Sequence, residues 1–131
     1  MQQLTWDQFD ACVATLAQRW RDRSFTGLYG VPRGGLCLAV ALSHALDRPL
    51  LDSPDPGCLI VDDVYESGRT LNAFHAQFPD ACFVVWMSKQ PLDWWDAAVI
   101  VTRDEWLVFP WENRERAHLD EQAYRLSHHV D

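Results

Sequence analysis

Short apolar runs alternate with helical patterns along most of the chain, and this alternation limits the fold more than any other feature. The strand-like runs fall at 27–31, 58–61, 81–87 and 97–101. Apolar residues at helical spacing fill two of the stretches between successive runs, at 36–46 and 70–78. Strands joined through helices form βαβ units. We therefore expect an α/β fold with a mainly parallel, twisted sheet flanked by helices.

The rest of the chain carries shorter signals. Thr5 and Gln8 match a capping box, which predicts that a first helix, over about 6–21, begins there. Further expected elements are a short strand at 49–51, loops at 52–57 and 62–68, a last strand at 106–109 and a helix at 114–126. The sequence has no internal repeat, low-complexity stretch or linker, so we expect a single domain over residues 1–131.

Composition excludes several classes of protein. With 131 residues, of which 48% are hydrophobic and 23% charged, the chain has the composition of one globular domain and not of a disordered protein. Its net charge of −8 opposes binding to nucleic acid or to an anionic membrane surface, so we expect neither as a partner. No apolar run is long enough to cross a bilayer. The four cysteines are spread singly, which is typical of free thiols in a cytoplasmic protein.

A glycine-rich loop, Gly30–Gly35, follows the first predicted strand and opens a helix. In parallel sheets, ligands bind beyond the carboxyl ends of the strands. Glycines let the backbone approach a ligand closely, and free N–H groups at the start of a helix attract anions. Arg33 adds a guanidinium group that suits phosphate oxygens. The pattern is typical either of an anion site or of an ordinary strand-to-helix turn with a surface arginine.

A second loop gives a more specific signal. Asp62 and Asp63 follow the buried strand at 58–61, and the stretch Ser67–Thr70 then opens a helix. Hydroxyls and N–H groups at that helix start suit a phosphate. The two carboxylates cannot face the same phosphate, because like charges ~4 Å apart repel by about 4 kcal/mol at an effective dielectric constant near 20. They suit neutral hydroxyls, such as a sugar diol, or a hard cation. Helix capping, the alternative, explains one acid but not both.

This second loop resembles the phosphoribosyl-diphosphate (PRPP) motif of the type I phosphoribosyltransferases: an apolar strand, two acids, a few residues, then T/S-G-x-T. The segment Gly30–Gly35 resembles the pyrophosphate loop of that family. Within the family the match is best to the xanthine–guanine and other 6-oxopurine enzymes. Met87–Leu92 resembles their lysine-bearing loop, and Asp104–Glu112 resembles their D-x-W…P-W-[DE] segment. The resemblance covers about residues 27–112.

The resemblance implies an enzyme, a purine phosphoribosyltransferase of type I fold. Such an enzyme transfers the ribose 5-phosphate of PRPP to guanine, xanthine or hypoxanthine and releases pyrophosphate. The implied cofactor is Mg²⁺, and the implied partners are PRPP and a purine base, with a nucleoside monophosphate as product. The alternative is a non-catalytic protein that binds PRPP or a nucleotide on the same fold. Arg33 and Lys89 favour the enzyme, because a PRPP sensor needs no lysine that reads a base.

The resemblance also implies a role for each residue of the two loops. The residues implied to hold the 5′-phosphate are Ser67, Gly68, Arg69 and Thr70, and those implied to hold the pyrophosphate are Pro32, Arg33, Gly34 and Gly35. Asp62 and Asp63 would hold the ribose hydroxyls, and Asp63 would also reach Mg²⁺. The residues implied in catalysis are Asp62, Asp63, Glu66 and Arg33. The peptide bond between Pro32 and Arg33 is expected to be cis, as it often is in these pyrophosphate loops.

The base would meet further residues. Lys89 would donate a hydrogen bond to the purine O6, and Trp106 would stack on the ring with Leu107 beside it. A cationic donor favours a 6-oxo base, because the 6-amino group of adenine would leave it unpaired. Glu66 stands where the family usually carries an aspartate near the purine N7. The alternatives are a solvated loop lysine for Lys89 and core packing for Trp106.

The sequence departs from the family pattern in the connection between Gly35 and Asp62, which is short. The family normally carries there a long mobile loop that closes over the substrates. Here the expected helix at 36–46 takes up much of the connection and leaves only the loop at 52–57. Without a lid the site is wetter, which weakens the electrostatic interactions that catalysis uses. Three outcomes stay open: a partner subunit of a homo-oligomer covers the site, the enzyme is slow, or the protein binds nucleotide without turnover.

Overall fold

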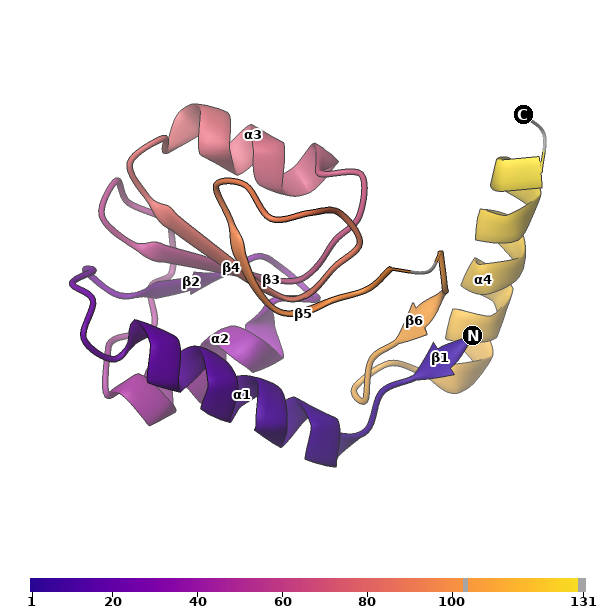
Figure 1. Cartoon of the computed structure of the whole chain (residues 1–131), viewed down its shortest axis with the longest axis horizontal. Coiled ribbons are helices and arrows are strands. Elements are labelled where there is room, and N and C mark those ends of the chain that lie inside the picture. Colours follow the sequence, from indigo (N-terminus) through magenta and orange to yellow (C-terminus); the bar gives the residue numbers. More distant parts are fainter. Residues whose placement is uncertain (103, 130–131) are drawn as a thin grey trace. The chain divides into compact units, whose positions relative to one another are not determined.

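The computed structural model describes residues 1–102 and 104–129. Its elements are β1 (Gln2–Gln3), α1 (Trp6–Trp20), β2 (Leu28–Gly30), α2 (Leu36–Leu46), β3 (Leu59–Tyr65), α3 (Arg69–Gln77), β4 (Cys82–Ser88), β5 (Asp96–Ile100), β6 (Leu107–Val108) and α4 (Arg114–His129) (Figure 1). They fall into two compact units. The larger lies between residues 11 and 103, and the smaller combines residues up to 10 with those from 104 onward. One domain over residues 1–131 stays a prediction.

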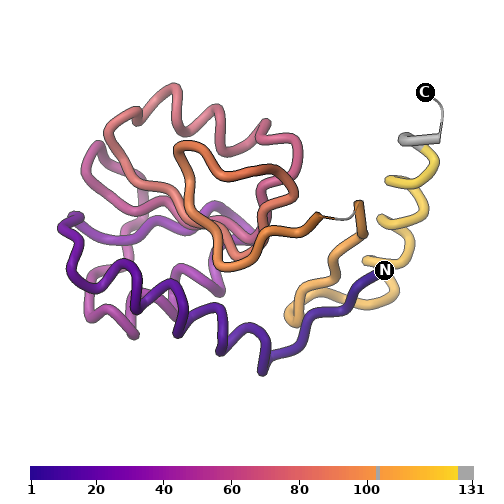
Figure 2. Tube along the Cα trace, viewed as in Figure 1, coloured from indigo at the N-terminus to yellow at the C-terminus, as the bar shows by residue number. Residues whose placement is uncertain are grey.

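The larger unit is built on a four-stranded sheet in the order β2-β3-β4-β5, in which every neighbouring pair is parallel. The chain passes through α2 and then α3, on opposite sides of the sheet, as it moves from β2 to β4 (Figure 2). Both faces of the sheet are thus covered, as parallel sheets require. The predicted α/β fold with a parallel sheet flanked by helices is confirmed.

Apolar side chains on the central strands and on the inner faces of the helices form the core. Ile60 and Val61 on β3 and Val84 and Val85 on β4 are fully buried. Residues 59–61 and 82–87 on these strands read as continuous apolar runs because helices lie on either side of the sheet. The expected cap of the first helix is present: the Thr5 backbone N–H donates to Gln8 Oε1 at 2.8 Å, and the Gln8 N–H donates to Thr5 Oγ1 at 3.1 Å.

The second parallel strand is longer than the sequence pattern predicts. We expected a loop from residue 62, but β3 continues to Tyr65, because β4 offers pairing partners along the same length. Asp62 pairs with Val85, and Tyr65 pairs with Ser88. The two acids therefore lie on a strand held on its β4 side by backbone hydrogen bonds, and not on a free loop.

Two other elements differ from expectation. The strand expected at 49–51 is a single bridge between Leu28 and Leu50. The unexpected β1 has only two residues, both glutamine, and pairs in parallel with β6 in the smaller unit. A polar pair of residues carries no periodicity, so no sequence pattern could reveal this strand.

The described residues contain four free cysteines, of which Cys12 and Cys58 are buried. Burial raises the pKa of the Cys12 thiol to about 12, so this sulfur is an inert part of the core. None of the described helices combines the length and the apolar character that crossing a membrane requires.

Candidate active site

The two predicted loops follow neighbouring strands, β2 and β3, at the carboxyl end of the sheet. The Val31 N–H donates to the Val61 carbonyl at 2.9 Å, which continues the pairing of β2 with β3 into the first loop. The Gly35 N–H then donates to the Val31 carbonyl at 2.8 Å, and α2 begins at the next residue. The peptide bond between Pro32 and Arg33 is cis, as expected.

The backbone of the first loop lies directly against the acids of the second. A Cβ atom at Gly34 would collide with the Asp63 carboxylate. A Cβ atom at Gly35 would collide with the Val61 carbonyl oxygen and would lie 2.9 Å from the Asp62 Cα. Position 35 therefore requires glycine on steric grounds, whereas a methyl group at position 34 would have to displace the Asp63 side chain. The fold thus brings together two motifs that α2 and the following loop separate in the sequence.

Asp62 and Asp63 form a pair of neighbouring carboxyl groups that is largely shielded from water. Asp62 is only 8% exposed, and its Oδ1 accepts the Asp63 N–H at 2.9 Å. Asp63 Oδ1 accepts the Val64 N–H at 2.8 Å. Burial, followed by the charge of Asp63, raises the pKa of Asp62 to about 8, and burial also raises the pKa of Asp63. Without a ligand, burial therefore favours the protonated form of Asp62 near neutral pH.

Such a pair suits a ligand that brings hydroxyl donors or positive charge. The described residues include no group of three or more side chains able to hold a metal ion. Mg²⁺, however, is usually held by one or two carboxylates together with the oxygens of a phosphorylated substrate. The donor set of Asp62 and Asp63 therefore fits Mg²⁺ that arrives with a diphosphate.

The start of α3 provides the expected phosphate site. Gly68 has φ = +82°, and a Cβ atom there would collide with the Tyr65 hydroxyl, so the turn requires glycine. The Arg69 N–H donates to Ser67 Oγ at 3.3 Å, and the Asn72 N–H makes the first helical bond, to the Gly68 carbonyl at 2.7 Å. The N–H groups of the first turn have no partner within the helix and point out of its end. Ser67, Arg69 and Thr70 surround this turn, and Arg69 and Thr70 are exposed.

Arg33 is exposed on the first loop. Within the described part of the chain, no carboxylate lies within 4.0 Å of its guanidinium group. An arginine without an acidic partner, beside a turn that only glycine can form, is available to bind an anion.

Lys89 and Glu66, predicted separately to meet the base, lie together. Lys89 Nζ is 2.9 Å from Glu66 Oε1, and the Lys89 backbone N–H donates to the Tyr65 carbonyl at 2.8 Å. The Lys89 side chain is only 8% exposed, against 35% for Glu66. The alternative of a solvated loop lysine is therefore wrong.

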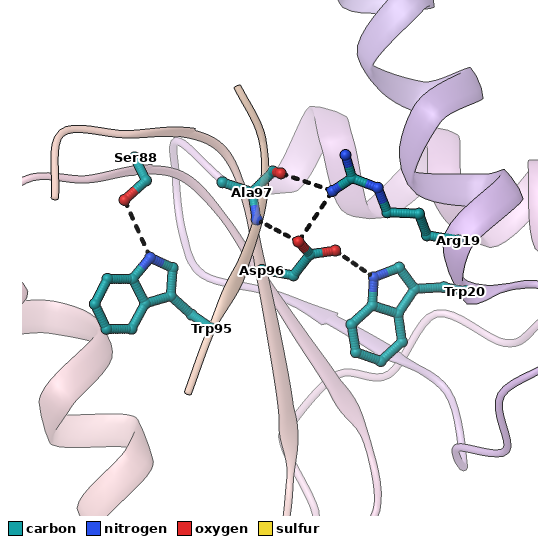
Figure 3. A network of polar contacts seen from close by, with 6 residues as sticks. All are labelled: Arg19, Trp20, Ser88, Trp95, Asp96 and Ala97. Carbon is teal, nitrogen blue, oxygen red and sulfur yellow. Dashed lines mark hydrogen bonds and ion pairs between the residues drawn. The ribbon is translucent and has the colours of Figure 1, made fainter. Parts of the chain in front are cut away.

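Ser88 is a residue that the sequence reasoning missed. Its side chain is fully buried, and Oγ donates to the Gln90 carbonyl at 2.7 Å. The same oxygen accepts the Trp95 indole N–H at 3.1 Å (Figure 3). These bonds fix the turn that carries Lys89. The one available signal was a polar residue at the end of an otherwise apolar strand, directly before the lysine.

Trp106 and Leu107 belong to the smaller unit. Leu107 lies on β6 and is buried. The Trp106 ring lies 5.0 Å from the Tyr124 ring, and its indole Nε1 is buried without a hydrogen-bond partner among the described residues. Contact of Trp106 and Leu107 with the base stays a prediction.

The loop at 52–57, the one candidate for a lid, lies at the wrong end of the sheet. Asp55 accepts the Thr26 hydroxyl at 2.7 Å and the Gly57 N–H at 2.9 Å. Thr26 precedes β2 and Gly57 precedes β3, so the loop is fastened at the amino ends of these strands. The candidate site lies at their carboxyl ends. This loop, whose residues are all described, therefore does not replace the lid of the family.

The sequence matches no family model. It is 30% identical to the xanthine-guanine phosphoribosyltransferase of Chromohalobacter salexigens, in an alignment that covers 83% of this chain and 82% of that protein. It is 27% identical to the xanthine-guanine phosphoribosyltransferase of Desulfotalea psychrophila, over 86% of this chain and 87% of that protein.

A solved structure of similar fold is the purine phosphoribosyltransferase of Pyrococcus horikoshii, with a TM-score of 0.72 and 28% identity over 85% of this chain and 93% of that one. The fold also matches the xanthine-guanine-hypoxanthine phosphoribosyltransferase of Helicobacter pylori, with a TM-score of 0.69 and 18% identity, over 91% of this chain and 97% of that one.

In the alignment with the C. salexigens relative, this chain lacks a residue at many of the aligned positions. The alignment spans 135 positions although it covers only 83% of a chain of 131 residues, so many positions have no counterpart here. By its sequence identity to these relatives and by its fold, the chain belongs to the type I phosphoribosyltransferases and, among them, to the xanthine–guanine phosphoribosyltransferase group.

Proposed function

We propose that the protein is an active purine phosphoribosyltransferase that moves the ribose 5-phosphate of PRPP to a 6-oxopurine and releases pyrophosphate. The observation that carries this proposal is the contact between the two loops. Gly34 and Gly35 lie directly against Asp63, Asp62 and the end of β3. One site thus combines an anion-binding loop, a pair of acids and a phosphate-binding helix start, which are the parts that PRPP requires.

The sugar and its 5′-phosphate would occupy the β3–α3 connection. The 5′-phosphate would accept hydrogen bonds from the first-turn N–H groups and from the hydroxyls of Ser67 and Thr70. The ribose diol would donate hydrogen bonds to Asp62 and Asp63, which takes the place of the proton on Asp62. Fixing the sugar at both ends places its C1 carbon between the leaving group and the incoming base.

The leaving pyrophosphate gains negative charge as its bond to C1 breaks. Arg33 and the backbone N–H groups of the first loop would stabilise that charge. Asp63 would hold Mg²⁺, which neutralises part of the charge of the diphosphate when it is bound. Pro32 would shape this loop and would lie against the pyrophosphate.

The base would lie beside Lys89 and Glu66. Lys89, shielded from water and fixed at the backbone by Tyr65, would donate to O6 of the purine. Glu66 would accept an N–H of the ring and take up its proton as the new bond to C1 forms. Trp106 would stack on the base, with Leu107 at its edge.

The same proposal extends to the domain organisation, the location and the partners of the protein. We propose that residues 1–131 act as one phosphoribosyltransferase domain in the cytoplasm, with PRPP and a purine base as partners and neither nucleic acid nor a membrane among them. A homo-oligomer in which a second copy covers the open site is one way to compensate for the missing lid. No observation favours the non-catalytic alternative.

The test is release of pyrophosphate from PRPP with Mg²⁺, with guanine, xanthine, hypoxanthine, adenine or uracil added singly. We expect release with at least one 6-oxopurine and none above the base-free background with uracil. The matched control is the double variant Asp62→Asn with Asp63→Asn, which should keep its circular dichroism spectrum and lose turnover. Binding of PRPP without release for any base would instead identify a non-catalytic protein.

A further inference from the structure

A cavity of about 590 Å³ lies in the larger unit at the amino ends of β4 and β5. The candidate active site lies at the opposite, carboxyl end of the sheet, so the cavity is separate from it. The end of α1, the start of β4 and the turn before β5 form its walls. The residues that decide what it can bind are Arg19, Trp20, Arg23, Trp94, Trp95 and Asp96. Its volume is in the range of small-molecule sites.

One wall of the cavity is rigid, because Asp96 ties α1 to β5. Asp96 Oδ1 accepts a hydrogen bond from Arg19 Nη1 at 3.0 Å, and its Oδ2 accepts the Trp20 indole N–H at 3.0 Å (Figure 3). Arg19 Nη1 also donates to the Ala97 carbonyl at 2.9 Å. The charge of Asp96 is therefore offset within the wall, and the indole of Trp20 is held in one orientation.

A second cation remains available in the cavity. The Arg23 guanidinium group lies over the Trp20 ring, 4.5 Å from its centroid. Within the described residues, no carboxylate lies within ion-pair distance of Arg23. Arg23 is exposed, so it can turn toward an anion without breaking an ion pair.

The walls also offer aromatic rings that are already ordered. Trp94 is half-buried and stacks on His75, with ring centroids 4.0 Å apart, whereas Trp95 is only 7% exposed and stacks on Tyr65 at 3.7 Å. Rings held in this way lose little freedom when a planar group packs against them. Guanidinium groups recognise phosphate, and indoles recognise the ring of a nucleobase. The carboxylates of the cavity keep its net charge near zero, which favours a single phosphate over a chain of them.

The cavity is linked to the candidate active site by Trp95. This residue lines the cavity, and its indole N–H donates to Ser88 Oγ at 3.1 Å. Ser88 fixes the turn that carries Lys89, and Tyr65, on which Trp95 stacks, accepts the Lys89 backbone N–H. A molecule that moves the Trp95 ring therefore acts on the position of the Lys89 ammonium group.

We propose that this cavity is a second ligand site that takes a nucleoside monophosphate, and that its occupancy adjusts base binding through Trp95, Ser88 and Lys89. The phosphate binds Arg23, and the base packs against the exposed part of the Trp94 ring. The site is proposed from its own geometry, whereas its effect on base binding rests on the proposed function. Since the proposed reaction makes a nucleoside monophosphate, the site would report the level of product.

The test of the site is the number of guanosine monophosphate molecules bound per chain, measured by equilibrium dialysis. We expect two for the unaltered protein and one for Arg23→Ala, with at least about a tenfold loss of affinity at the second site. Arg21→Ala, which removes an equal charge from the adjacent exposed surface, should leave two. Equal binding by the Arg23→Ala variant and the unaltered protein overturns the proposal. So does inorganic phosphate or guanosine alone binding as tightly as the nucleotide.

The test of the coupling is the KM for the base, measured with and without the nucleotide at the second site. We expect the nucleotide to change this KM severalfold in the unaltered protein and not in Arg23→Ala, whose basal kcat stays the same. Ser88→Ala should still bind two nucleotides but lose the effect on KM. If the proposed function fails, no turnover is seen, yet one nucleotide that depends on Arg23 is still bound. An effect on KM that persists in Ser88→Ala contradicts the route through that hydroxyl.

Discussion

Replacing Asp62 by asparagine should stabilise the ligand-free protein and at the same time inactivate it. Burial and the neighbouring charge of Asp63 raise the pKa of Asp62 from 3.8 to about 8. A rise of that size corresponds to about 6 kcal/mol of unfavourable free energy for the ionised form, at about 1.4 kcal/mol for each pKa unit. Water that enters the open site relieves part of it, so we expect about 3 kcal/mol, or about 10 °C in Tm for a chain of this length.

The sign of the pH dependence follows from the raised pKa. In the unfolded chain Asp62 releases its proton near pH 4, whereas in the folded protein it keeps the proton up to about pH 8. The stability that it contributes is complete below pH 4 and is lost as the pH rises from there through 8. An asparagine side chain does not titrate and has no such dependence. The difference in Tm between Asp62→Asn and the unaltered protein should therefore be near zero at pH 4 and largest above pH 8.

The assay is thermal unfolding followed by circular dichroism between pH 4 and pH 9, with EDTA present so that no cation binds the pair. The control is Asp52→Asn, because Asp52 is exposed and its replacement should not change Tm across this range. Turnover is measured on the same preparations, without EDTA, and should be lost only in Asp62→Asn. A Tm of Asp62→Asn that is equal to or below that of the unaltered protein at pH 8.5 would refute the reasoning.

Three further outcomes test the site. Gly34→Ala should raise the KM for PRPP by roughly ten- to hundredfold, because the new methyl group displaces the Asp63 carboxylate. Gly57→Ala, far from the acids, should leave this KM unchanged, and steady-state kinetics measure both variants. Lys89→Met should lower kcat/KM for 6-oxopurines by about 10–100-fold while leaving PRPP affinity, measured by calorimetry, unchanged. Without a base, PRPP and Mg²⁺ should still give a measurable release of pyrophosphate, because an unclosed site admits water to C1; complete dependence on a base in this assay would show that the site is covered.

Sequence patterns predicted the parts of the fold that depend on local periodicity. The buried strands read as apolar runs because helices cover both faces of the sheet, and α2 was evident from a stretch that is apolar almost all round. The acids were found by their place after such a run. Their setting on a strand was not, because the length of β3 is decided by hydrogen bonds to β4, a strand that follows only after α3 and leaves no mark on residues 62–65.

Sequence patterns also could not predict contacts between residues that lie far apart in the sequence. Lys89 and Glu66 were each assigned to the base, but their ion pair depends on how far β3 and β4 extend together. Ser88 was missed because a single serine has many uses, and only its bonds to Gln90 and Trp95 reveal its role in fixing the turn. The sequence could predict that Gly34 and Asp63 lie near each other. It could not predict that a side chain at position 34 would collide with the Asp63 carboxylate.

The absence of a lid limits how well this site can exclude water. In a closed site the exclusion of water strengthens every charge interaction. Within one chain this effect comes from burial against the sheet, and the residues that need it most are the ones that the fold buries. Asp62 is 8% exposed and the Lys89 side chain is 8% exposed, whereas Arg33 and Thr70, proposed to bind charged phosphates at the rim, are open to solvent. The shielded positions are those proposed to choose the sugar and the base, so the short connection between Gly35 and Asp62 should reduce rate more than specificity.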